Sequence, residues 1–141
     1  MVRQFESGRI FQLPLKRGED LQGELEKAVH SLLIDAGTVQ LIGAVYQARL
    51  GCFNLQTGEY EVVEVNEFAE IASGSGTISE RDGEPFVHMH VVLAGQGGHI
   101  YAGHLLPGSK LFVAEVTIFD LDGIPQQRRL DPETGLYLWQ H

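Results

Sequence analysis

Residues 18–37 read GEDLQGELEKAVHSLLIDAG, and this stretch decides the fold because it carries the one helical pattern of the chain. Apolar residues recur there at intervals of three and four, so they share one face of a helix. Acidic residues stand at its start, where the helix dipole favours negative charge. Gly37 stands where a helix would end. The pattern predicts a helix over residues 18–36. Its apolar face is formed by Leu21, Leu25, Ala28, Val29, Leu32 and Leu33.

Strand signatures lie on both sides of this helix. Residues 8–15 alternate loosely and predict a first strand. After the helix, runs rich in Val, Ile, Leu and Tyr are separated by glycine-containing turns, which is typical of strands. One helix among many short-turned strands predicts an α+β domain, with the helix packed on a mostly antiparallel sheet. The later strand runs are VQLIGAVYQARLG (39–51), CFNLQTGEYEVVEV (52–65, two strands around a turn), FAEIASGSGTISE (68–80), FVHMHVVLAG (86–95), HIYAGHLLPG (99–108) and KLFVAEVTIFDL (110–121).

The end of the chain differs in composition from the rest. Residues 1–121 form the predicted domain, and residues 122–141 form a polar tail with a short final strand at Leu136–Trp139. The apolar residues of that strand could dock on the body or on a partner subunit. His141, at the end of the tail, is expected in solvent.

Charge and cysteine content bound the class of protein. The 141 residues hold 10 basic and 19 acidic side chains, a net charge of −9. This disfavours direct binding to duplex DNA, because such binding depends on Lys and Arg replacing counterions; Arg128–Arg129 is the one adjacent basic pair in the second half. The lone Cys52 excludes an intrachain disulfide and fits a reducing compartment. We expect the thiol in the core.

No targeting or spanning segment is recognisable. The first residues mix charge into every short apolar run, unlike a signal peptide, and no run approaches the roughly 20 apolar residues that span a bilayer. We therefore expect a cytoplasmic protein with no membrane contact.

Three histidines carry the sharpest chemical signal. His88 and His90 stand two apart in a predicted strand, so both side chains point to the same face. A hairpin that turns near Gly95–Gly98 places His104 opposite or diagonal to them. Three neutral imidazoles on adjacent strands can bind zinc or another divalent metal and leave a fourth position open. The residues alone equally permit polar histidines on a half-exposed sheet face, and His99 is read as a turn residue.

Two carboxylates lie within apolar strand runs. Glu70 and Glu115 are expected on the solvent side of their strands. Glu70 is also the candidate for a carboxylate that orients a metal-bound histidine by accepting a hydrogen bond from the ring nitrogen that does not bind the metal. The chain holds no phosphate-binding loop, no dinucleotide-binding GxGxxG and no nucleophile elbow, so no catalytic residue is assigned.

Several runs together resemble the plants-and-prokaryotes-conserved domain, called PPC or PCC, over about residues 8–120. They are GEDLQGELEKAV (18–29), GAVYQARLGCFN (43–54), DGEPFVHMHVVL (82–93) and GGHIYAGHLLPG (97–108). The most specific piece is the His-x-His strand followed by a glycine–histidine–leucine run, although Ala102 replaces a glycine that the family has there.

The resemblance implies an α+β fold and a homotrimer, the partner being the chain itself. For some prokaryotic members it also implies a metal site, whose histidines match His88, His90 and His104. It therefore favours the metal over the polar-face interpretation. In plants the domain accompanies basic AT-hook segments that bind DNA, and this sequence has no such segment.

Three functions follow as hypotheses. The favoured one is a homotrimeric module of regulatory or assembly role with a histidine-based metal or small-ligand site. The second is a small zinc-dependent hydrolase or lyase; it lacks an obvious general base, a role that Glu70 could serve. The third, DNA binding, is disfavoured by the acidity and by the missing AT-hook.

Overall fold

Helix α1 spans Leu21–Leu32 and is shorter than predicted. The computed structural model describes residues 1–140, so the expectation for His141 lies outside the described residues. The helix begins where Asp20 Oδ2 accepts a hydrogen bond of 2.9 Å from the N–H of Gly23. That bond satisfies one of the N–H groups left unpaired in a first helical turn.

The helix ends four residues before the predicted boundary because Leu33 adopts the left-handed conformation, with φ of 55°. The chain then turns so that Ile34 is fully buried. Leu33, which the spacing placed on the apolar face, is instead 81% exposed. The predicted helix was too long because Gly37 was read as its end signal. Gly37 does not end the helix but begins the next strand.

The remaining elements are strands, as predicted, with two differences. Residues 39–54 form one long strand rather than two, and a strand lies in the tail where none was predicted. The strands are β1 (Glu6–Pro14), β2 (Gly37–Asn54), β3 (Glu59–Val65), β4 (Ala69–Arg81), β5 (Glu84–Ala94), β6 (Ile100–Leu105), β7 (Lys110–Asp122), β8 (Gln127–Leu130) and β9 (Tyr137–Trp139).

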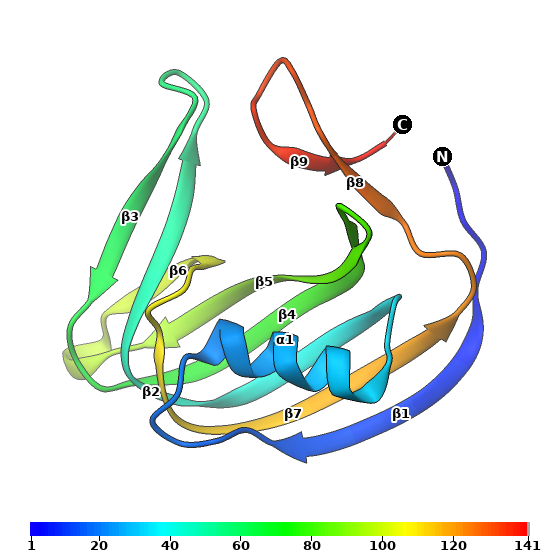
Figure 1. Ribbon diagram of the computed structural model, residues 1–141. Helices are drawn as coiled ribbons and strands as arrows, with labels where there is room; N and C mark the ends of the chain where they lie inside the picture. The colour runs from blue at the N-terminus through cyan, green and yellow to red at the C-terminus, as the bar shows by residue number, and fades with distance from the viewer. Residues whose placement is uncertain (141) are drawn as a thin grey trace.

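All nine strands join one sheet in the order β1-β7-β2-β6-β5-β4-β8-β9, with β3 added on β2. Every pairing is antiparallel except β4 with β8. The long β2 serves twice, because its first half pairs with β4 and β7 and its second half with β3 and β6. The sheet therefore curls into a ring of β2, β4, β5 and β6, and the β2–β3 hairpin projects as an arm (Figure 1). The α+β expectation is confirmed, with helix a small share of the fold.

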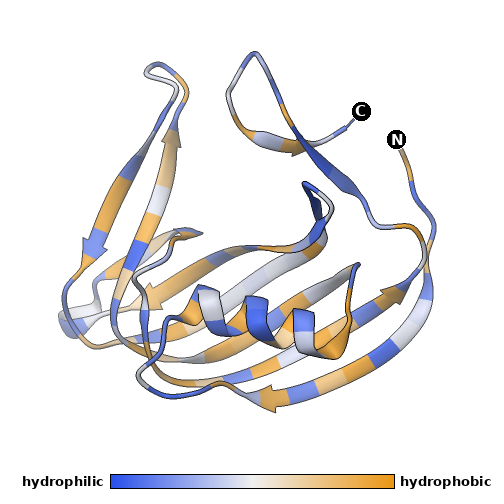
Figure 2. Ribbon diagram, in the orientation of Figure 1, coloured by the Kyte–Doolittle hydropathy of each residue, from blue (hydrophilic) through white to orange (hydrophobic). Residues whose placement is uncertain are grey.

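Helix α1 covers one face of the curved sheet (Figure 1). Hydrophobic and hydrophilic residues alternate along β1, β2 and β7 (Figure 2), as expected when one sheet face is buried. The core between helix and sheet is large and apolar, so burial accounts for the fold without disulfide or metal staples. Its largest fully buried side chains include Leu21, Leu25, Ile34, Leu50, Ile71, Met89, Leu93, Leu105, Leu111 and Ile118.

The opposite face of the sheet is uncovered. It carries an open groove of about 800 Å³ that crosses β1, β7, β2 and β4. Gln12, Gln40, Ser75 and Thr117 line it together with the apolar Ile42, which is 54% exposed.

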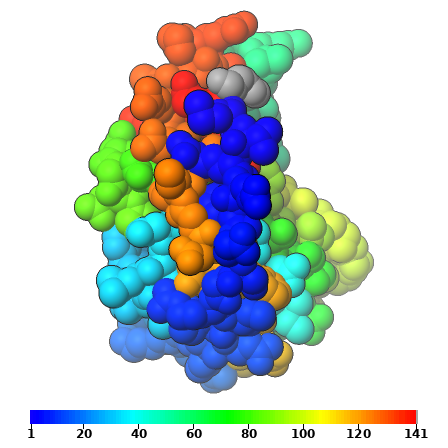
Figure 3. Space-filling view, turned by 90° about the vertical axis from the view of Figure 1, so that its right-hand side faces the viewer, coloured from blue at the N-terminus to red at the C-terminus, as the bar shows by residue number. Residues whose placement is uncertain are grey.

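The tail is attached to the sheet and not separate from it. Strand β8 pairs in parallel with the end of β4, and β9 pairs with β8. The N-terminal ammonium of Met1 donates to the carbonyl oxygen of Gln140 at 2.8 Å. Figure 3 shows the N-terminal segment running beside β7 to reach the C-terminal segment.

Two further sequence expectations have structural outcomes. Cys52 is exposed on β2 and not part of the core: it shares a strand face with the buried Leu50 but lies farther along, in the part of β2 that pairs with β3 in the arm. Among the described residues, no helix is both long and apolar enough to cross a lipid bilayer.

Candidate metal centre

The β5–β6 hairpin positions two of the three histidines opposite each other. Its turn contains Gly97 and Gly98 with φ of 66° and 80°, a conformation that glycine adopts without strain. The register pairs His90 directly with His104, as the sequence predicted.

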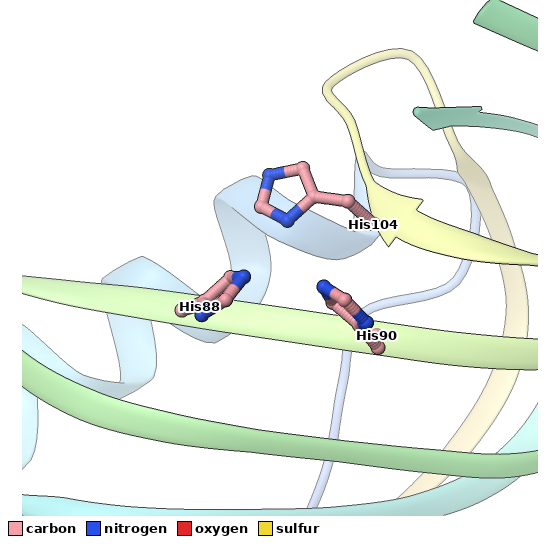
Figure 4. Close-up of side chains that lie close together, drawn as sticks. All are labelled: His88, His90 and His104. Carbon is pink, nitrogen blue, oxygen red and sulfur yellow. The ribbon is translucent and has the colours of Figure 1, made fainter. Parts of the chain in front are cut away.

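Strand parity places the third histidine on the same face. Val87, Met89 and Val91 of β5 are at most 2% exposed and pack into the core. His88 and His90 alternate with them and therefore project from the outer face. Figure 4 shows the three rings turned toward a common space, with one nitrogen of each ring facing it.

The rings are close enough to share an ion. Each histidine offers a nitrogen, and these three nitrogens lie within 4.8 Å of one another. The ring of His88 lies 5.0 Å from that of His90 and 4.9 Å from that of His104, between centroids. The ring of Tyr60, from the β2–β3 arm, lies 5.6 Å from His104 and limits how that imidazole can turn.

One nitrogen of the cluster lacks a partner. His104 Nδ1 is buried, and no hydrogen bond reaches it in the part of the chain that the structure describes. A buried polar atom without a partner is unfavourable unless an ion or ligand satisfies it. Three imidazole nitrogens are a donor set that divalent zinc accepts, so the residues present fit the implied metal.

The surroundings keep two of these imidazoles uncharged. Burial, followed by the nearby Arg128 guanidinium and the other two histidines, together lower the pKa of His88 to about 4. Burial, His90 and Arg128 also lower the pKa of His104. Because only a neutral imidazole has a lone pair for a metal, both rings are ready to bind at neutral pH.

Arg128 is the site residue that sequence reasoning missed. It is 8% exposed, and its Nη2 lies 3.1 Å from His88 Nδ1. It also donates to Ser79 Oγ at 2.9 Å and to Thr77 Oγ1 at 3.3 Å on β4, and to the carbonyl oxygen of Tyr137 at 3.2 Å. The sequence showed only a basic pair in a polar tail, and nothing in it indicated that β8 would return to β4.

The two candidate carboxylates are not part of the cluster. Glu70 is exposed and pairs with Ala94, whereas Ser75 pairs with His90. Those two β4 positions are separated by roughly 16 Å along the strand. Glu115 is exposed on β7, which β2 and β4 separate from β5, so it lies on the solvent side as expected.

Within residues 1–140, one helix packs on a curved, mostly antiparallel sheet, and three histidines converge on the outer face of that sheet. The protein is thus of the class of small α+β domains with a candidate histidine metal site. The chain matches the model of the Plants and Prokaryotes Conserved (PCC) domain over residues 2–122 and belongs to that family. The family expectation from the sequence is confirmed.

Solved structures resemble the whole chain. A metal-containing protein from Archaeoglobus fulgidus is 38% identical, with a TM-score of 0.93 over 100% of this chain and 99% of the other. A plant- and prokaryote-conserved protein from Pyrococcus horikoshii is 32% identical, with a TM-score of 0.93 over 100% and 98%.

Curated relatives are longer proteins. The bifunctional protein GlmU of two Synechococcus strains is 35% identical over 135 residues, which cover 94% of this chain. The chain spans only 20% of the length of these relatives.

Proposed function

We propose that this protein is a metal-binding PCC protein in which His88, His90 and His104 hold one divalent ion of the zinc type. The observation that carries the proposal is the convergence of three nitrogens within 4.8 Å, one of them buried without a partner. The metal-containing relative from Archaeoglobus fulgidus, at 38% identity, supports it. When bound, such an ion supplies an electrophilic centre with a coordination position open to water or a ligand.

The test is metal content measured by mass spectrometry on purified protein. We expect close to one zinc-type ion per chain in the wild type and strong loss in His90→Ala and His104→Ala. His99→Ala is the matched control, because His99 lies in the same hairpin but is exposed at its turn. Equal metal content in all four proteins, or none in any, would refute the site.

We propose further that the chain acts as a homotrimer of regulatory or assembly role. The uncovered groove of about 800 Å³ supports a partner on the outer sheet face. Ser75 lines this groove and pairs with His90, so an assembled neighbour would lie beside the metal centre. Light scattering should give about 47 kDa, three times the 15.6 kDa chain. A mass of one chain would exclude the assembly.

The second candidate is a small zinc-dependent hydrolase or lyase. The open coordination position favours it, since three protein ligands and a water are the usual catalytic arrangement. The position of Glu70 counts against it, because that carboxylate lies away from the cluster. No carboxylate within residues 1–140 is hydrogen-bonded to any of the three histidines. Turnover of an ester, lactone or phosphate substrate that is lost in His90→Ala would establish this alternative.

A further inference from the structure

Arg128 is a buried cation without a buried anion beside it. The chain holds 19 acidic residues, yet none of the ion pairs among the described residues includes Arg128. Its contacts all go to neutral acceptors. A guanidinium held away from water is unfavourable unless a negative charge lies close to it.

Binding of a metal changes what His88 offers to Arg128. Nδ1 of His88 already lies 3.1 Å from the guanidinium, so Nε2 is the nitrogen left to bind an ion. A neutral imidazole that binds through Nε2 carries its proton on Nδ1 and becomes a donor there. The Nδ1–H of His88 and the Nη2–H of Arg128 would then face each other as two donors.

An oxyanion oxygen that lies beside this pair of nitrogens, within hydrogen-bond distance of both, removes the conflict because it accepts from both. Metal-ligating histidines commonly donate their second N–H to a carboxylate or another acceptor. The four contacts of Arg128 also use four of the five N–H bonds of a guanidinium, which leaves a further donor. A divalent ion, a guanidinium and three neutral imidazoles carry net positive charge, which an anion offsets.

We propose that the metal-loaded centre binds a small oxyanion, a carboxylate or phosphate group, held by Arg128 and His88. This inference rests on the proposed metal site and adds its ligand class. The planar fork of arginine suits both groups. The rings of Phe86 and Trp139 lie 5.7 and 5.6 Å from the guanidinium carbon.

The test is calorimetric titration of acetate and of inorganic phosphate into zinc-loaded and into chelator-treated protein, at constant ionic strength set with chloride. We expect one of the two to bind the zinc-loaded wild type at least ten times more tightly than the zinc-free form. Arg128→Gln should weaken that binding at least tenfold. Arg129→Gln is the matched control, because Arg129 is the exposed neighbour whose side chain contacts Gln127, and it should bind like the wild type.

Metal content, measured on every variant, separates the two proposals. A zinc-loaded wild type that binds neither oxyanion overturns the inference and leaves the metal site standing. Protein that never binds zinc refutes the metal site, and equal oxyanion affinity in wild type and Arg128→Gln then overturns this inference as well.

Two measurements remain if Arg128→Gln fails to fold. Arg128→Lys keeps the charge but loses the fork, and it should bind the oxyanion less tightly than the wild type. In the unmutated, zinc-loaded protein, the oxyanion should slow hydrogen exchange of the β8 amides. Unchanged exchange, or a lysine variant equal to the wild type, contradicts the assignment.

Discussion

The orientation and the protonation state of His88 depend on two features, its place in strand β5 and its contact with Arg128. Strand parity turns it away from Met89 and the core, and the returning tail then covers it with Arg128. Partial burial beside a cation disfavours the imidazolium, so the ring stays neutral well below its ordinary titration range. The same arrangement that prepares the lone pair for a metal makes the folded state sensitive to acid.

The metal-free protein should lose stability as the pH falls from 7 to about 4. The pKa of His88 is about 4 in the folded protein against 6.5 as its ordinary value. Between these two pH values the unfolded chain binds more protons than the folded protein. The free energy of unfolding therefore decreases as the pH is lowered. We expect His88→Gln to remove about 1–2 kcal/mol of this dependence, a figure reduced for the exposed part of the ring.

Urea unfolding at pH 7.0 and 4.5 with chelator present measures the effect. His99→Gln, at the exposed turn, should keep the wild-type dependence. An unchanged pH dependence in His88→Gln would contradict the assigned cause.

At the scale of elements, Asp20 joins the helix start to the loop before β7. Its Oδ2 caps Gly23, and its Oδ1 accepts from the N–H groups of Gly108 and Ser109 at 2.7 and 3.0 Å. Ser109 is fully buried. One carboxylate therefore fixes both where α1 begins and how the chain enters β7.

Asp20→Ala should lower the free energy of unfolding by about 2–3 kcal/mol, since it removes a helix cap and two bonds to loop N–H groups. The matched control is Glu19→Ala, which removes only an exposed ion pair with Lys16 and should change stability by less than about 0.5 kcal/mol. Chemical denaturation of both variants measures the difference, and equal losses would disprove the capping role.

Elements differed in how well the sequence predicted them, for physical reasons. The β5–β6 hairpin was predictable because a glycine turn and a period of two fix the register of His90 and His104 locally. Helix α1 was overestimated because Gly37 was read as its end signal, whereas the chain leaves the helix at Leu33, a residue type that rarely adopts the left-handed conformation. Strand β8 was missed because it has only four residues and its parallel contact with β4 covers two residue pairs, which leave no local pattern in the sequence; Arg128 was missed with it.

At the scale of the whole molecule, the helix and the histidines lie on opposite faces of the sheet. Helix α1 closes one face, and the groove and the metal centre share the other. Apolar side chains exposed on that face, Ile42 at 54% and Val113 at 41%, remain without contacts that would bury them in a single chain. An exposed apolar sheet face is typical of an assembly surface.

Ile42→Lys should therefore convert the proposed trimer to single chains. A charge in the middle of the groove opposes burial, and because Ile42 is already 54% exposed, the fold of each chain should lose little stability. Ile124→Lys is the control, since Ile124 is 66% exposed but lies outside the groove lining. Light scattering should show 15.6 kDa for the first and about 47 kDa for the second. If Ile42→Lys remained a trimer, the assembly surface would have to lie outside the groove. If its single chains kept the metal, each chain would complete the histidine centre by itself.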